Sequence, residues 1–208
     1  MAKTVELTTL ESGTARRHPD VFAHRIPMDG DEWVEDGGLP RTTGARTVID
    51  VAASRPFVEA VVVADSALRL QVATREEMVE LARRRPRRGA ARMLRVAGFA
   101  AGLSETVGES VSRVGLASQG VPPPILQLVV GDFRSDFGWP ELRTLGEFDG
   151  RLKYTDPAVL WAEKLREDHL RDLGWELVRW TWEQITTAPQ VVAQRLFRAF
   201  ARSARRAG

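Results

Sequence analysis

The second half of the chain alternates helical and strand-like patterns, and this order constrains the fold more than any other feature. Helical spacing begins after Ser104-Glu105-Thr106, which suits a helix N-terminus, and continues to Gln119. The segments that follow predict three strands, a helix, a strand and a helix, over residues 125–131, 134–139, 143–148, 156–173, 175–180 and 189–203. An α-β-β-β-α-β-α order predicts an α/β domain.

The first half of the chain predicts a separate, mostly helical region. A short strand is expected over residues 4–9 and a loop over 29–41, where Asp-Gly and Gly-Gly turn signals occur. Four helices should follow, over 43–53, over 57–70, from a Thr74–Glu77 capping box onward, and over 89–99. We place the boundary between residues 100 and 104, which gives an N-terminal region 1–103 and a second domain 104–208.

The composition excludes several classes of protein. With 43% hydrophobic and 28% charged residues, the chain is typical of soluble globular proteins, and no apolar run approaches the roughly 20 residues of a membrane span. The absence of cysteine excludes disulfides, thiolate zinc sites and a cysteine nucleophile, and the histidines show no metal-ligand spacing. Residues 1–13 lack the apolar segment of a secretory signal, so we expect a cytoplasmic protein.

One hairpin carries the residues with the clearest chemical meaning. A turn over residues 140–143 places Asp136 directly opposite Glu147, and Asp149 lies on the same face two residues further on. Lys153 follows closely. Like charges across a strand pair are destabilising, so either this face is solvated or the acids share a divalent cation. Oxygen ligands suit Mg²⁺ or Mn²⁺, and the flanking aromatic residues favour a half-buried hairpin over one on the surface.

Further residues extend this pattern into a recognisable set. They are residues 104–109, Gln127, 135–140, 146–154, 163–167, 173–175 and Arg179. Together they resemble the endonuclease-like domain related to very short patch repair endonucleases, within the PD-(D/E)XK nuclease superfamily. The resemblance covers residues 104–186. It implies a restriction-endonuclease-like core, with a mixed sheet flanked by helices, in which Mg²⁺ activates water to hydrolyse phosphodiester bonds.

The resemblance implies a role for each charged residue of the hairpin. Asp136 and Glu147 match the two acids that bind metal, and Glu109 matches an extra acid that many members place beside them. Asp149 stands where the superfamily usually has lysine, and Lys153 stands where related domains often have histidine. The implied catalytic residues are these five, with Glu109, Asp136 and Glu147 as the ligands of Mg²⁺ or Mn²⁺.

The N-terminal region carries a second resemblance. Residues 42–52 and 60–69 resemble the middle region of AbiEi-type antitoxin proteins of actinobacteria. In that family a DNA-binding winged helix often precedes this region, and we expect it to be absent here. The resemblance implies a toxin or another protein as a possible partner beside DNA.

Two groups of arginines are candidates for contact with the DNA backbone. The first is a run without an acidic residue, which suits either phosphate contacts or a solvated loop: Arg83, Arg84, Arg85, Arg87 and Arg88. The second group, Arg166 and Arg179, should flank the hairpin. These two either face DNA or form structural ion pairs with Glu147 or Asp149.

The sequence leaves two functions open. The first is a metal-dependent DNA endonuclease, and the acids retained together favour it. The second is a non-catalytic antitoxin-like or regulatory protein that uses the nuclease fold to bind nucleic acid or a partner protein. Asp149 in the place of lysine and the expected absence of the winged helix favour this second function.

Overall fold

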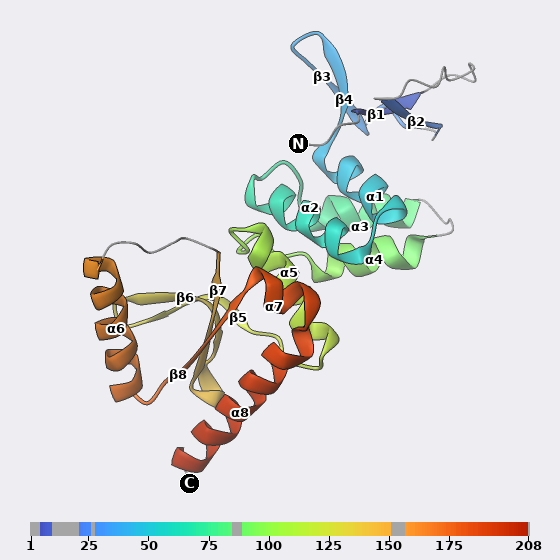
Figure 1. Cartoon of the computed structure of the whole chain (residues 1–208). Coiled ribbons are helices and arrows are strands. Elements are labelled where there is room, and N and C mark those ends of the chain that lie inside the picture. Colours follow the sequence, from blue (N-terminus) through green and yellow to red (C-terminus); the bar gives the residue numbers. More distant parts are fainter. Residues whose placement is uncertain (1–4, 10–20, 26–27, 85–88, 151–156, 208) are drawn as a thin grey trace.

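The computed structural model describes residues 5–9, 21–25, 28–84, 89–150 and 157–207, and it has the α/β architecture that the sequence predicts. The helices of the first half lie at one end of the molecule, and a four-stranded sheet with its own helices lies at the other (Figure 1). None of the helices in these ranges is long and apolar enough to cross a membrane.

Four helices form the centre of the N-terminal part, as predicted. They are α1 (Gly44–Ser54), α2 (Phe57–Arg69), α3 (Arg75–Arg84) and α4 (Ala90–Phe99). The predicted capping box is present, since the Glu77 amide donates to Thr74 Oγ1 at 3.2 Å and the Thr74 amide donates to Glu77 Oε2 at 2.7 Å. Buried aliphatic side chains from all four helices pack into one core.

Two short strand pairs precede these helices. β1 (Val5–Thr9) and β2 (Val21–Arg25) are parallel, whereas β3 (Trp33–Asp36) and β4 (Leu39–Thr42) form an antiparallel hairpin. The prediction of a loop over residues 29–41 is therefore wrong. The turn signal at Gly37-Gly38, where both residues have a positive φ, closes a hairpin instead. Almost every residue of its strands is exposed, so no apolar alternation marks them in the sequence.

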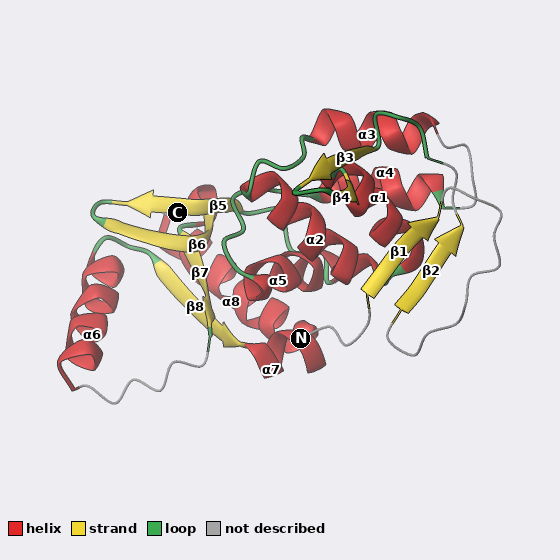
Figure 2. Cartoon of the chain, turned by 90° about the horizontal axis from the view of Figure 1, so that it is seen from above, coloured by secondary structure: helices red, strands yellow, loops and turns green. Residues whose placement is uncertain are grey.

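The C-terminal part is a mixed sheet with helices on both faces. The strands β5 (Ile125–Val130), β6 (Phe133–Trp139), β7 (Thr144–Asp149) and β8 (Glu176–Thr181) lie in that order, with β7 and β8 parallel and the other neighbours antiparallel. The helix α6 (Pro157–Asp172) packs on one face. The helices α5 (Val107–Ser118), α7 (Trp182–Thr187) and α8 (Pro189–Ala207) pack on the other face (Figure 2). The sequence pattern did not predict the short helix α7.

The helix α5 joins the two parts of the chain. Asp65 of α2 is 1% exposed and accepts hydrogen bonds from the Ala101 amide, Ser110 Oγ and Arg113 Nη1, each at 2.7 Å. Ser110 and Arg113 belong to α5. The N-terminal helices therefore hold the helix that carries Glu109 in place.

Candidate active site

The strands β6 and β7 pair near their turn and then separate. Their last paired residues are Phe137 and Gly146; beyond this point β6 pairs with β5 alone, and β7 pairs with β8 alone. We call this point the fork. The predicted register of the hairpin is confirmed, and it makes Asp136 and Glu147 the first residues beyond the fork, one on each strand.

Asp136 is an acid whose pKa is raised by its burial and by the charges of other acids. Its Oδ2 accepts the Phe148 amide at 2.9 Å, which links the two strands where their ladder has ended. Burial raises the pKa of Asp136 to about 6, the hydrogen bond from Phe148 opposes the rise, and the charges of Glu109, Glu147 and Glu105 add to it. A carboxyl group with a perturbed pKa among like charges is a property of many functional sites.

Glu109 approaches the fork from α5. Its side chain is buried, with 5% of the residue exposed. Its Oε1 accepts a hydrogen bond from Thr106 Oγ1 at 2.7 Å, and its Oε2 accepts hydrogen bonds from the Glu105 amide and from Gln127 Nε2, each at 2.9 Å. Thr106 is the N-cap of α5, and a glutamate three residues after an N-cap commonly turns back toward it. Glu109 thus stabilises the helix terminus, while its charge also acts on Asp136.

A glycine lets α5 lie close to β7. A Cβ atom at Gly108 would lie 2.0 Å from the ring of Phe148. Only a residue without a side chain leaves room for this approach. Gly108 therefore brings Glu109, its neighbour in the helix, close to the strand that carries Glu147.

Glu147 is neutralised by two arginines. Arg166 of α6 donates to Oε1, and Arg179, which faces Glu147 across the β7–β8 ladder, donates to Oε2 at 2.9 Å. The Glu147 side chain is only 14% exposed, so these ion pairs are shielded from water. Of the two interpretations of Arg166 and Arg179, the structure shows the ion pairs, whereas contact with DNA stays a prediction.

The remaining candidates from the hairpin are less informative. Asp149 lies at the end of β7, partly buried and opposite Thr181 of β8. Lys153 lies outside the described residues.

The arginine run on α3 does not form one free basic surface in the described ranges. Arg84 is engaged by two acids, with Asp31 at 2.7 Å and Glu80 at 2.5 Å, and the guanidinium group lowers the pKa of Asp31. Arg83 is exposed at the end of the helix. The other members, Arg85, Arg87 and Arg88, lie outside the described residues.

Comparison with known proteins gives relatives but no described activity. Two proteins of Mycobacterium tuberculosis, uncharacterized protein MT2308 of strain CDC 1551 / Oshkosh and uncharacterized protein Rv2248 of strain ATCC 25618 / H37Rv, are each 32% identical to the chain over 211 residues. The match covers 99% of this chain and 77% of each relative. This chain belongs to their family. No protein-family model matches it, and no solved structure matches it significantly.

The carboxylates of the described residues do not form a three-ligand metal centre. In the part of the chain that the structure describes, no three Asp, Glu, His or Cys side chains are grouped closely enough to hold a metal ion. The expected ligand set of Glu109, Asp136 and Glu147 is therefore not assembled in the structure. Two arginines hold the side chain of Glu147. Mg²⁺ needs less, since one or two carboxylates commonly bind it together with water and substrate phosphates. The oxygen donors of Asp136 and Glu109 fit that pattern.

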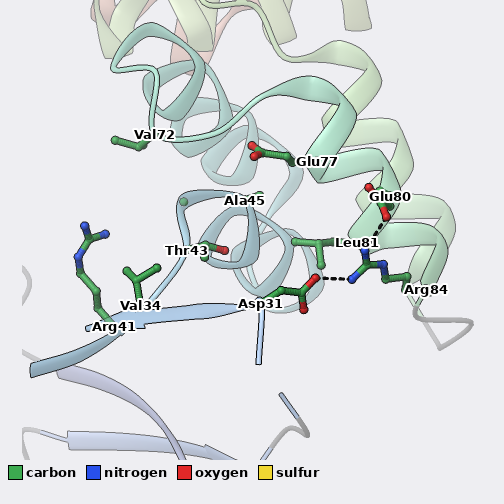
Figure 3. Close-up of a pocket in the computed structure, with 11 residues that line it drawn as sticks. Asp31, Val34, Arg41, Thr43, Ala45, Val72, Glu77, Glu80, Leu81 and Arg84 are labelled. Carbon is green, nitrogen blue, oxygen red and sulfur yellow. Dashed lines mark hydrogen bonds and ion pairs between the residues drawn. The ribbon is translucent and has the colours of Figure 1, made fainter. Parts of the chain in front are cut away.

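Two cavities of the described residues lie beside the N-terminal helices. One of about 480 Å³ lies between the β3–β4 hairpin, α1 and α3, and its wall carries the Asp31–Arg84–Glu80 ion pairs (Figure 3). The second, of about 470 Å³, lies between α1, α2 and the start of α5. Because Glu105 and Thr106 line this second cavity, it borders the segment that positions Glu109.

Several residues that shape the fork have no recognisable role in the sequence pattern. Arg134 of β6 binds Glu105 through two hydrogen bonds, at 2.8 and 3.0 Å. Gln127 belonged to the resembling set without a function of its own, and it binds Glu109. The left-handed φ of Gln127 leaves no trace in a hydrophobic pattern, and the Arg134–Glu105 pair depends on how α5 approaches the sheet.

Proposed function

We propose that this chain is a metal-dependent DNA endonuclease whose C-terminal domain has the restriction-endonuclease-like core of the PD-(D/E)XK superfamily. The order α5-β5-β6-β7-α6-β8, with β7 and β8 parallel, supports this proposal. The observation that carries it is the position of Asp136. At the fork, Asp136 lies partly buried among three acids, and in the described part of the chain its carboxylate has one hydrogen bond, from a backbone amide.

In this proposal, the acids of the fork bind the metal ion and the arginines position Glu147. Asp136 and Glu109 would hold Mg²⁺ or Mn²⁺, and the bound ion supplies positive charge and an activated water for attack on a phosphodiester. Asp136 has to lose its proton first, and near neutral pH it does so readily because its pKa is about 6. Arg166 and Arg179 keep Glu147 in place and leave positive charge beside the fork, where a phosphate would lie.

A second function has its own support. Both oxygens of Glu147 are bound by arginines, and Asp149 stands where a nuclease of this superfamily usually has lysine. These features favour a non-catalytic module that binds nucleic acid or a partner protein. The resemblance of residues 42–52 and 60–69 to antitoxin proteins fits such a role, with a toxin as one possible partner.

Cleavage assays separate the two functions. Supercoiled plasmid and a fluorescent duplex oligonucleotide are incubated with the protein and Mg²⁺ or Mn²⁺, and Asp136→Asn is compared with wild type. We expect cleavage by wild type and a loss of at least about 100-fold in Asp136→Asn, because the variant lacks the main anionic ligand. The matched control is Asp132→Asn, an exposed acid in the β5–β6 turn, which should cleave like wild type.

Two results would contradict this proposal, one of them its site and the other its activity. One is cleavage that persists in a correctly folded Asp136→Asn protein, which would remove the site assignment. The other is DNA binding by wild type without turnover in either cation, which would favour the non-catalytic module. Circular dichroism and the melting temperature of each variant establish that it is folded.

A further inference from the structure

Gln127 stands at an irregular point of β5. Its neighbours Leu126 and Leu128 pair with Phe137 and Ser135 in one continuous register, so Gln127 lies opposite Asp136 and these two residues are missing from the ladder. Its φ of 53° lies in the left-handed region, which residues other than glycine seldom adopt. Residues kept in such sparsely populated backbone conformations are frequent at functional sites. A glutamine kept in a glycine-like conformation suggests that its side chain matters.

The side-chain amide of Gln127 is satisfied at one end only. Its Nε2 donates to Glu109 Oε2 at 2.9 Å, which fixes the orientation of the amide. Its Oε1 is buried and has no hydrogen-bond partner among the described residues. A buried carbonyl oxygen without a partner is unfavourable, and it can be satisfied only by a hydrogen-bond donor or a cation.

The surroundings of this oxygen select the cation. Gln127 donates to Glu109 and lies opposite Asp136, and neither carboxylate can donate a hydrogen bond to Gln127 Oε1 when ionised. An amide oxygen is a good ligand for Mg²⁺ and Mn²⁺. It also adds a ligand to the acidic fork without adding another negative charge.

We propose that the Gln127 amide oxygen is a ligand of the divalent cation, beside Asp136 and Glu109, and that the same amide holds Glu109 in position. This inference rests on the proposed function, because it assumes a cation at the fork. It explains why β5 carries a glutamine with a left-handed backbone at this point of the chain.

Calorimetric titration of the full chain with Mn²⁺ and Mg²⁺ tests the inference, with the melting temperature as a second readout. Gln127→Gly removes the amide and relieves the left-handed backbone, so Mn²⁺ affinity should fall at least about 10-fold while the melting temperature of the cation-free protein stays equal or rises. Gln127→Glu keeps an oxygen at the same place. Its Mn²⁺ affinity should equal or exceed that of wild type, and its cation-free melting temperature should fall because a further acid joins the fork.

The outcomes distinguish this inference from the proposed function. If Asp136→Asn abolishes Mn²⁺ binding but Gln127→Gly binds like wild type, the role of Gln127 is refuted and the site at the fork stands. If Gln127→Glu is as weak as Gln127→Gly, the oxygen is not a ligand. If wild type binds neither cation, alone or with duplex DNA, the inference and the metal-dependent function both fail.

Discussion

Asp65 and Asp136 are both carboxylates withdrawn from water, yet the chain surrounds them in opposite ways. Asp65 accepts three hydrogen bonds at 2.7 Å, one of them from the guanidinium group of Arg113. Within the described residues, Asp136 accepts one amide hydrogen bond and no hydrogen bond from a cation, and the charges of Glu109, Glu147 and Glu105 raise its pKa. The arginines near the fork are bound to Glu147 and Glu105 instead. An acid with a matched cation joins two parts of a fold, whereas an acid among acids is poised to take a cation from solution.

The largest expected effect comes from breaking the matched acid. Asp65→Asn leaves Arg113 with a buried, uncompensated charge, so the free energy of unfolding should fall by about 3 kcal/mol. Urea denaturation followed by circular dichroism measures it. The double variant Asp65→Asn/Arg113→Gln should recover part of the loss. A change below about 1 kcal/mol in Asp65→Asn would show that this pair does not hold α5.

The unmatched acid should respond in the opposite direction. The pKa of Asp136 in the folded protein is about 6, above its ordinary value of 3.8, so ionisation of Asp136 disfavours the folded state at pH above 6. Asp136→Asn keeps an acceptor for the Phe148 amide, and at pH 7.5 it should raise the free energy of unfolding by about 1–2 kcal/mol.

The pH dependence provides the control for this variant. The gain in Asp136→Asn should be nearly complete at pH 6, shrink as the pH falls from 6 to 4, and vanish only below the unfolded-state pKa of 3.8, where Asp136 is protonated in both states. Urea denaturation at pH 7.5, 6.0 and 4.0 measures it. A variant that is destabilised at pH 7.5 would mean that Asp136 has a structural counter-charge after all.

The smallest effect is expected at the rim of the fork. Arg134 and Glu105 form an exposed pair, with 55% and 47% of their side chains accessible, so Arg134→Gln should cost about 0.5 kcal/mol or less. It should also raise the pKa of Asp136 slightly, because the charge of Glu105 would be less neutralised. Arg41→Gln, which breaks the exposed pair with Asp36, should cost the same and leave Asp136 unchanged.

The contrast between the two acids follows how far apart their partners lie in the sequence. Asp136 and Glu147 lie within one hairpin, so the turn and the two-residue period of a strand were enough to predict the register that makes them the first residues beyond the fork. Asp65 meets Arg113 only after several helices have packed together, and no local pattern connects them. For the same reason the sequence could offer ion pairs for Arg166 and Arg179 only as one of two possibilities.

The helices and strands also differ in how well the sequence predicts them. The helices and the strands of the sheet were predictable because their apolar spacing is regular and prolines and glycines mark their ends. The β3–β4 hairpin was not, because its four-residue strands are almost wholly exposed. The helix α7 follows β8 without a break, and its Thr181–Gln184 capping box was the signal that could have revealed it.

Direct titration of Asp136 tests most sharply whether the fork is an acid site that takes a cation. The side-chain carboxyl ¹³C shift of Asp136, assigned by comparison with Asp136→Asn, is followed by NMR between pH 3 and pH 9, with and without Mg²⁺. We predict a midpoint near pH 6 without the ion and a clear fall of the midpoint when Mg²⁺ is added. A midpoint near pH 4 that does not move with Mg²⁺ would contradict both the acidic character of the fork and its proposed cation.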